Sequence, residues 1–354
     1  DLEQPSKVVQ VPKTLRTPRI IAIEPTCTQY VQQGLMEMIV GGIRRDRTLR
    51  HLIGFDDQVP NQELARLGSL YGKLATLDLS EASDRVPNEL VKLLFADHPY
   101  LSKAVQACRS FKAHGPGFEI NSLAKFASMG SALCFPVEAM CFTALIFDGI
   151  AKSRGVPVTR RLIREAIGQV RVYGDDLIVP VDCVNSVVSS LENFGFQVNE
   201  RKSFWNSHFR ESCGKEYYHG NDVSVVRVRE VLPARLSDHT SVISLVEFRN
   251  LSYERGLWHL ASKIDEWLVK VLRHYPVIHR GSQALGRVSF LPYEGERVCP
   301  NLQRDLVRAR VVSVNTPINE LDGSGALLKF FLKRGDEPLS RDHLRRSGRA
   351  VAVR

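Results

Sequence analysis

Several features that would direct a chain towards a membrane or an oxidising compartment are scarce in this 354-residue sequence. Its seven cysteines are odd in number and contain no C-x-x-C pair, which argues against a disulfide framework or a zinc site and favours a reducing compartment. No apolar run is long enough to cross a bilayer. The best candidate, residues 132–151, contains Pro136, Glu138 and Asp148, so we expect a buried helix there.

The chain also lacks an initiator Met and the apolar opening of a signal peptide, and it begins with the polar stretch DLEQPSKVVQ. We therefore expect a fragment or a processed product. The composition, 44% hydrophobic and 25% charged, is that of an ordinary globular protein. At this length we expect a sizeable core and two or three subdomains.

Acidic residues do not balance the basic ones, and the formal net charge is +9. The basic residues gather in three places: around Lys13, Arg16 and Arg19, within 44–50, and within 341–354. Any one cluster could be a solvated face. Three clusters in a basic chain favour a polyanionic partner such as nucleic acid.

Hydrophobic periodicity predicts an α+β arrangement in the central part of the chain. The predicted elements are a buried strand over 73–79, helices over 88–95, 136–150 and 184–194, a hairpin around Gly174, a strand over 223–231 and a helix over 257–275. We expect core packing, rather than a ligand site, for the apolar stripe of the last helix: Leu257, Leu260, Ile264, Trp267, Leu268, Val271 and Leu272.

The stretch VYGDDLIVP places Asp175 and Asp176 at the apex of the hairpin. A tight turn alone explains Gly and Asp there, and Asp78 could be a helix N-cap. If the 73–79 strand pairs beside the hairpin, however, three carboxylates converge, and their repulsion calls for cations or protons. Such oxygen ligands suit Mg²⁺ or Mn²⁺, and two of these ions support in-line displacement at phosphorus.

Phosphoryl transfer to a growing chain needs further groups, and the sequence offers a candidate for each. The basic segment 13–19 could bind a triphosphate, and the small-residue loop SMGS (128–131) could hold template and nucleotide. Lys202 is a plausible general acid, whereas the guanidinium of Arg201 scarcely deprotonates. Taken alone, the SMGS segment could be a plain loop and Lys202 could be a solvated turn residue. The whole set of features in this order, however, favours nucleotidyl transfer.

Five segments in order resemble the motifs of viral RNA-dependent RNA polymerases. They are IIAIEPT (20–26), ATLDLSEASDRVP (75–87), FASMGSALCFPVEAM (126–140), VYGDDLIVP (172–180) and FRESCGKEYYHGNDV (209–223). The sequence is most similar to the replicase subunit of leviviruses, the positive-strand RNA phages, over about residues 13–230.

The resemblance implies a right-hand polymerase fold with palm, partial fingers and thumb. The implied domains are partial fingers with a basic NTP-entry segment over 1–72, a palm with the metal site over 73–208 including a fingers-like insertion over 104–127, a primer-grip-like element over 209–235, and the thumb and C-terminal region over 236–354.

The resemblance also implies roles for individual residues. Those implied for catalysis and metal binding are Asp78, the Leu79 carbonyl, Asp175 and Asp176, with Lys202 as proton donor. Those implied for nucleotide binding are Lys13, Arg16, Arg19, Ser83, Asp84, Ser128, Gly130 and Ser131. The chain departs from the pattern at two of these places: many relatives have Asn where Ser131 stands, and Ser83 occupies the position of the ribose-sensing acid of better-known polymerases, one residue before Asp84.

The implied function is an RNA-dependent RNA polymerase that copies viral RNA from NTPs with two Mg²⁺ ions, for which Mn²⁺ could substitute. Its partners would be template and product RNA, NTPs and host translation elongation factors, in the cytoplasm of a bacterial host and without a membrane. A reverse transcriptase or a catalytically silent RNA-binding relative are the alternatives. Gly174 before the acid pair and the DLSxASD segment favour RNA copying, and the intact acids argue against a silent relative.

Overall fold

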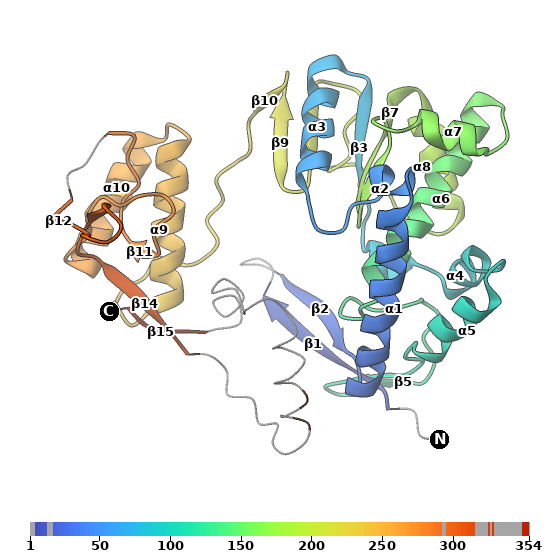
Figure 1. Cartoon of the computed structure of the whole chain (residues 1–354), viewed down its shortest axis with the longest axis horizontal. Coiled ribbons are helices and arrows are strands. Elements are labelled where there is room, and N and C mark those ends of the chain that lie inside the picture. The colour runs from blue at the N-terminus through green and yellow to red at the C-terminus, as the bar shows by residue number, and fades with distance from the viewer. Residues whose placement is uncertain are drawn as a thin grey trace. The chain divides into compact units, whose positions relative to one another are not determined.

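The computed structural model describes residues 4–12, 17–291, 295–315, 325, 328 and 349–353. The chain divides into two compact units, residues 1–225 and 226–354 (Figure 1). Each unit contains a hydrophobic cluster of its own. The carboxylates singled out from the sequence all lie in the first unit.

The first unit alternates helices with short strands. Its first half contains β1 (Ser6–Pro12), β2 (Pro18–Ile23), α1 (Thr26–Arg45), α2 (Leu49–Leu52), α3 (Val59–Tyr71), β3 (Leu74–Asp78), the 3₁₀ helix η1 (Ala82–Arg85), α4 (Asn88–Leu94), α5 (Pro99–Ala107), β4 (Ala113–Gly115) and β5 (Phe118–Ile120). Its second half contains α6 (Cys134–Arg154), α7 (Arg160–Glu165), β6 (Arg171–Tyr173), β7 (Asp176–Pro180), η2 (Val181–Cys183), α8 (Val184–Asn193), β8 (Phe209–Ser212), β9 (Lys215–Tyr218) and β10 (Asn221–Asp222).

The central sheet of this unit has the strand order β3-β7-β6 and is antiparallel. Apart from their aspartates, β3 and β7 are short runs of consecutive buried residues, all apolar except Thr76, which is the pattern of strands covered on both faces. Helix α3 contacts all three strands, and α6 contacts β6 and packs on α8 (Figure 1). Two further sheets, β2-β1-β4-β5 and β10-β9-β8, complete the unit within the described residues.

Helix α6 is the central helix of the core. By length and composition it could cross a membrane, the one such helix among the described residues. However, 78% of its most apolar stretch is buried inside the protein, as expected of a core helix. Its contact with α8 is very close, because a Cβ added at Gly149 would lie 2.5 Å from the Cα of Val187.

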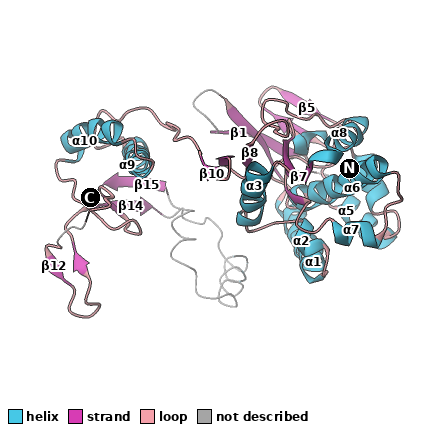
Figure 2. Cartoon of the chain, turned by 90° about the horizontal axis from the view of Figure 1, so that it is seen from above, coloured by secondary structure: helices cyan, strands magenta, loops and turns pink. Residues whose placement is uncertain are grey.

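The second unit is built on a helix pair with small strands beside it. Its elements are α9 (His239–Glu254), α10 (Trp258–Leu272), β11 (Ala284–Leu285), β12 (Arg297–Val298), β13 (Asp305–Leu306), β14 (Arg310–Asn315) and β15 (Arg349–Val353). Figure 2 shows α9 and α10 along one side of β14 and β15. The Arg249 guanidinium makes two parallel 2.8 Å hydrogen bonds to the Asp265 carboxylate and so joins the two helices.

Most of the predicted elements are confirmed. The buried strand, the hairpin around Gly174 and the three predicted helices of the first unit correspond to β3, β6–β7, α4, α6 and α8. The predicted strand over 223–231 is wrong, because the regular structure there ends at β10 and 223–230 contains no strand. Val225 and Val228 are exposed, since no second strand pairs with this segment at the boundary of the two units.

The predicted core stripe of the last helix is correct only in part. Ile264, Leu268 and Leu272 are buried in α10. Leu257, Leu260 and Trp267 remain more than 40% exposed, so the prediction that they belong to the core is wrong. The apolar stripe of α10 is wider than the face that α9 covers.

The α6–α8 contact generates a stability prediction. Replacing Gly149 by Ala should lower the free energy of unfolding by about 1–3 kcal/mol, because the added methyl group meets backbone atoms of α8 that cannot move aside. Gly42 lies in α1 with open space around it, so Gly42→Ala should raise stability by about 0.5–1 kcal/mol through helix propensity. Urea denaturation followed by circular dichroism measures both, and equal effects would contradict the close contact.

Candidate active site

Two of the sequence-predicted carboxylates face each other across adjacent strands. Asp78 ends β3 and is the register partner of Asp176, the first residue of β7, while Asp175 lies in the turn before it. The turn requires glycine at position 174, where φ is +58° and a Cβ would lie 2.5 Å from the Phe135 ring. The structure therefore brings the three aspartates to one end of the central sheet.

The segment after α8 holds Asp78 from the other edge of β3. Asn199 donates from its backbone to the Asp78 carbonyl at 2.8 Å and from its side chain to the Asp78 carboxylate at 3.0 Å. The Ser203 hydroxyl accepts from the Asp78 backbone N–H at 3.0 Å. Lys202 lies in the same turn, exposed, and its charge opposes the rise in the pKa of Asp78 that burial causes. The turn 199–203 thus positions both the carboxylate and the lysine.

The β8–β9 hairpin holds Asp176 in a similar way. The Ser212 hydroxyl and the Cys213 backbone N–H both donate to one carboxylate oxygen of Asp176, at 3.2 and 3.0 Å. Asn61 of α3 donates to the Asp176 carbonyl at 3.4 Å. The FRESCGK segment, implied to be a primer grip, therefore also supports an acidic residue.

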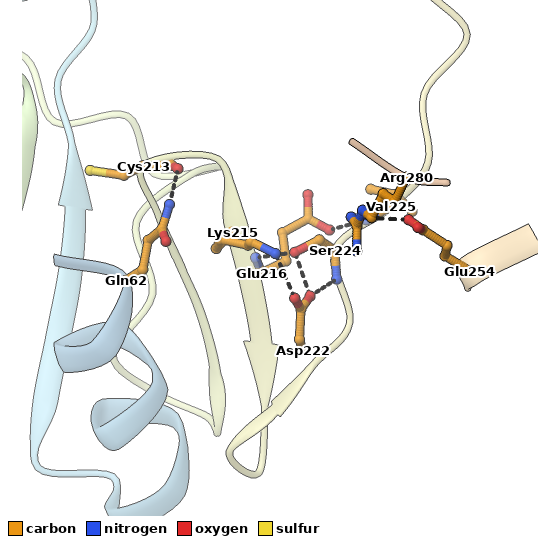
Figure 3. A network of polar contacts seen from close by, with 9 residues as sticks. All are labelled: Gln62, Cys213, Lys215, Glu216, Asp222, Ser224, Val225, Glu254 and Arg280. Carbon is orange, nitrogen blue, oxygen red and sulfur yellow. Dashed lines mark hydrogen bonds and ion pairs between the residues drawn. The ribbon is translucent and has the colours of Figure 1, made fainter. Parts of the chain in front are cut away.

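Polar contacts fix that hairpin on α3 and close it at its outer edge. Figure 3 shows the Gln62 amide donating to the Cys213 carbonyl at 3.1 Å and Lys215 paired with Asp222 at 2.8 Å. The Ser224 hydroxyl and backbone N–H both donate to Asp222 as well. The support of Asp176 is thus itself anchored to the first unit.

The electrostatic state of the aspartates favours a cation. Burial raises the pKa of Asp78, with smaller contributions from the charges of Asp175 and Asp176. Burial likewise raises the pKa of Asp176, and the charge of Asp175 adds to it. A cation among these oxygens would relieve that repulsion. Among the described residues, no three or more His, Cys, Asp or Glu side chains are arranged so that they could hold a metal ion by themselves.

Glu138 is a buried acid that the sequence reasoning did not assign to the site. It lies on α6, and burial raises its pKa to about 8, with the charges of Asp175 and Asp84 acting in the same direction. The Cys134 thiol, one helical turn earlier, contacts its carboxylate at 3.9 Å. Near neutral pH this carboxyl is protonated and adds no charge to the cluster.

The SMGS loop is attached directly to the strand that carries Arg19. The Ala22 N–H of β2 donates to the Met129 carbonyl at 2.8 Å. Gly130 has φ +121°, and a Cβ there would lie 2.0 Å from the Ala22 carbonyl oxygen. Arg19 is exposed three residues earlier on the same strand. The structure thus brings two of the predicted nucleotide-binding elements together.

A buried network underlies that loop. The Gln32 side chain of α1 accepts from the Ser131 hydroxyl at 3.0 Å and donates to the Cys108 carbonyl at 2.8 Å. Ser110 donates to the carboxylate of Glu24, whose pKa burial raises. Ser131 is therefore fixed by α1 and is itself buried.

The other predicted nucleotide contacts lie in different settings. Ser83 is buried in η1, whereas Asp84 is exposed and forms an ion pair with Lys125. Lys13 and Arg16 lie outside the described residues.

Sequence reasoning missed the supporting residues Gln32, Asn199, Ser203 and Ser212. Ser212 falls within a quoted motif, so the motif marked the right segment without its contact to Asp176. The other three bond residues about 100 or more positions away, and local pattern carries no signal for such contacts.

Comparison with solved structures identifies the class of fold. The chain is similar to the RNA-dependent RNA polymerase of BmCPV in its quiescent state, with a TM-score of 0.50 and 12% identity, over 70% of this chain and 25% of that one. This likeness shows the polymerase fold and confirms the predicted α+β class.

Sequence comparison identifies the family. The RNA replicase beta-chain family matches residues 1–249, and the chain belongs to that family, as the levivirus resemblance predicted. It is 38% identical over 233 residues to the RNA-directed RNA polymerase subunit beta of Qbeta virus (strain MX1), covering 65% of this chain and 37% of that protein. Against the subunit of the same name from Escherichia virus Qbeta it is 37% identical over 238 residues, covering 67% and 38%. The chain thus spans well under half the length of these relatives.

The buried acid on α6 generates a prediction about pH. Between the ordinary pKa of Glu138, 4.5, and its value in the folded protein, about 8, the folded state holds a proton that the unfolded state has lost. The free energy of unfolding should therefore fall as pH rises through this window and level off above it. Glu138→Gln should reduce that fall by up to about 1.4 kcal/mol per pH unit, measured by urea denaturation at several pH values.

A second acid on the same helix provides the control. A hydrogen bond from Lys152 lowers the pKa of Asp148, so its contribution changes only in more acidic solution. Asp148→Asn should leave the slope between pH 5 and 8 as in the wild type. An unchanged slope in Glu138→Gln would mean that this carboxyl is not protonated in the folded protein.

Proposed function

We propose that this chain carries the catalytic core of an RNA-dependent RNA polymerase that extends RNA from NTPs. The observation that carries the proposal is the register of Asp78 against Asp176, with Asp175 in the adjoining turn, in a chain of the replicase family. The activity of the whole protein is part of the proposal, because the chain covers 37–38% of the length of the relatives cited above.

The three aspartates and the Leu79 carbonyl would hold two divalent ions, Mg²⁺ or in its place Mn²⁺. The donor set supports this choice, because all of its ligands are oxygen atoms and the pKa values of Asp78 and Asp176 are raised partly by neighbouring negative charge. When bound, such ions supply charge neutralisation for in-line displacement at phosphorus. The protein's part is to hold Asp78 through Asn199 and Asp176 through the β8–β9 hairpin.

Lys202 would hold the proton that the departing pyrophosphate receives. Its ammonium is exposed and close enough to Asp78 for its charge to oppose the rise in the pKa of that carboxyl that burial causes. The turn that carries it is tied to β3 by the Asn199 and Ser203 hydrogen bonds. A lysine fixed beside the acids can both stabilise charge and release a proton, which a guanidinium scarcely does.

The nucleotide would lie between β2 and the loop that touches it. Arg19, with Lys13 and Arg16 before it in the sequence, would bind the triphosphate through charge-assisted hydrogen bonds. The remaining proposed contacts are Ser83, Asp84, Ser128, Gly130 and Ser131. The backbone contact between Ala22 and Met129 supports this arrangement, since it joins the two elements.

The division into partial fingers, palm, primer-grip element and thumb is proposed with the boundaries predicted from the sequence. RNA template and product and NTPs are the proposed ligands. The relatives are named as beta subunits, and this supports a place in a larger assembly; host translation elongation factors are the proposed partners, in the bacterial cytoplasm.

Metal binding is the first test, because it does not depend on the parts of the relatives that this chain does not span. Isothermal titration calorimetry should detect Mg²⁺ binding to the wild type and a loss of that binding in Asp175→Asn. Incorporation of labelled NTPs on an RNA template should fall on the order of 100-fold or more in the same variant. Asp182 is an exposed acid that follows the far end of β7. Its replacement, Asp182→Asn, should change neither Mg²⁺ binding nor NTP incorporation. Equal Mg²⁺ binding by all three proteins would rule out the proposed metal ligands.

Lys202 is tested by separating rate from binding. Lys202→Ala should slow single-turnover incorporation about 10²- to 10⁴-fold and leave RNA affinity nearly unchanged, because a proton donor acts in the transition state. Lys202→Arg should not restore the rate, since guanidinium keeps its proton. Arg201→Ala, the exposed neighbour, serves as control. Rescue by arginine would show that only the positive charge matters.

A further inference from the structure

The second compact unit contains a cavity that carries four cations and an aromatic ring. The loop before α9, the C-terminal part of α10 and the start of β14 line it. Its charged and aromatic members are Arg235, Trp267, Lys270, Arg273 and Arg310, and none of its lining residues is acidic. Its volume of about 500 Å³ is within the range of ligand-binding sites.

Two nearby acids are bonded outside the cavity, and a third lies beside it. On α10, Asp265 pairs with Arg249 and Glu266 pairs with Lys263. Asp238 lies beside the cavity, because it accepts hydrogen bonds from the backbone N–H groups of the lining residues Arg235 and Ala234; these bonds lower its pKa and fix the loop, and the charge of Arg235 acts in the same direction. In the part of the chain that the structure describes, no acidic side chain forms an ion pair with any of the four cations of the cavity. The cavity therefore concentrates positive charge.

Two hydrogen bonds hold this arrangement in place, and one lining residue has an unusual backbone conformation. The Arg310 guanidinium donates to the Leu272 carbonyl at the end of α10, at 2.8 Å. The Trp267 indole N–H donates to the Pro233 carbonyl at 3.0 Å. Arg273 follows α10 with φ +62° and ψ −43°, a backbone conformation that residues other than glycine rarely adopt. A long basic side chain at a position that favours glycine suggests that the side chain itself has a use.

We propose that this cavity binds single-stranded RNA, with a backbone phosphate among the four cations and a base stacked on Trp267. The cations alone would suit any polyanion, but Trp267 is 43% exposed as a residue, and its indole adds a stacking surface. Basic grooves with exposed aromatic rings are how proteins hold single strands without reading their sequence. The inference rests on the proposed RNA-copying function. Of the five charged and aromatic residues named for the cavity, all but Arg235 lie beyond residue 249, where the match to the replicase family ends.

The cations are tested by the salt dependence of binding. The full chain is titrated against a labelled oligouridylate at several salt concentrations. In the double variant Arg235→Ala/Lys270→Ala, affinity should fall at least tenfold, and the slope of log affinity against log salt should become shallower by up to about 0.7, the contribution of the one phosphate held there. Lys263→Ala/Arg280→Ala removes two exposed cations of the same unit outside the cavity and should keep the wild-type slope.

The ring is tested separately. Trp267→Ala should weaken binding at least about fivefold without changing the salt slope. Trp267→Phe loses the hydrogen bond to Pro233 but keeps an aromatic ring. Because the ring can still stack on a base, this variant should retain most of the affinity. If Phe weakens binding as much as Ala, the residue acts only by supporting the loop, and stacking is overturned. Circular dichroism of each variant shows that the fold is kept.

The outcomes separate this inference from the proposed function. If the wild type does not bind the oligouridylate at all, RNA binding by the chain fails, and with it the proposed function. If the wild type binds and the cavity variants bind equally with the same slope, only the cavity proposal is overturned. Displacement of the RNA by polyglutamate from the wild type but not from the cavity variants would assign the cavity to an acidic protein segment instead.

Discussion

The antiparallel pairing of β3 with β7 in one register is the constraint on which the rest of the site depends. It places Asp78 opposite Asp176, and a shift by one residue would turn the side chains of a strand to the opposite face. Both strands are buried runs, so alternation alone does not specify this register. It is secured from outside the pair: residues 198–204 bridge to the free edge of β3, and the β8–β9 hairpin bonds the Asp176 carboxylate.

The same arrangement crowds negative charge in a partly buried place. Burial raises the pKa values of Asp78 and Asp176, so keeping these two carboxylates charged destabilises the folded state. Hydrogen bonds from Asn199, Ser212 and Cys213 offset part of this destabilisation. Groups held in such an unfavourable state by the surrounding fold are typical of catalytic sites.

How far the sequence predicted the structure depended on the range of the interactions. The hairpin, β3, α6 and α8 have strong local patterns, and the family motifs in order pointed to the three aspartates. The alternation of 223–231 misled because a period of two does not show whether a partner strand exists. The exposure of Trp267 depends on how much of α10 the neighbouring helix covers. The bonds that fix Asp78, Asp176 and Ser131 join residues far apart in sequence, so only the folded chain reveals them.

The contact of Gly130 with β2 separates two properties that are usually linked. Residue 130 is exposed to solvent, and exposure is the ordinary guide to positions that tolerate substitution. Here the backbone of Ala22 occupies the space that any side chain would need. In a saturation mutagenesis of this chain, position 130 would behave like the interior of α6 rather than like the surface. A ranking of its positions by accessibility would misplace this one.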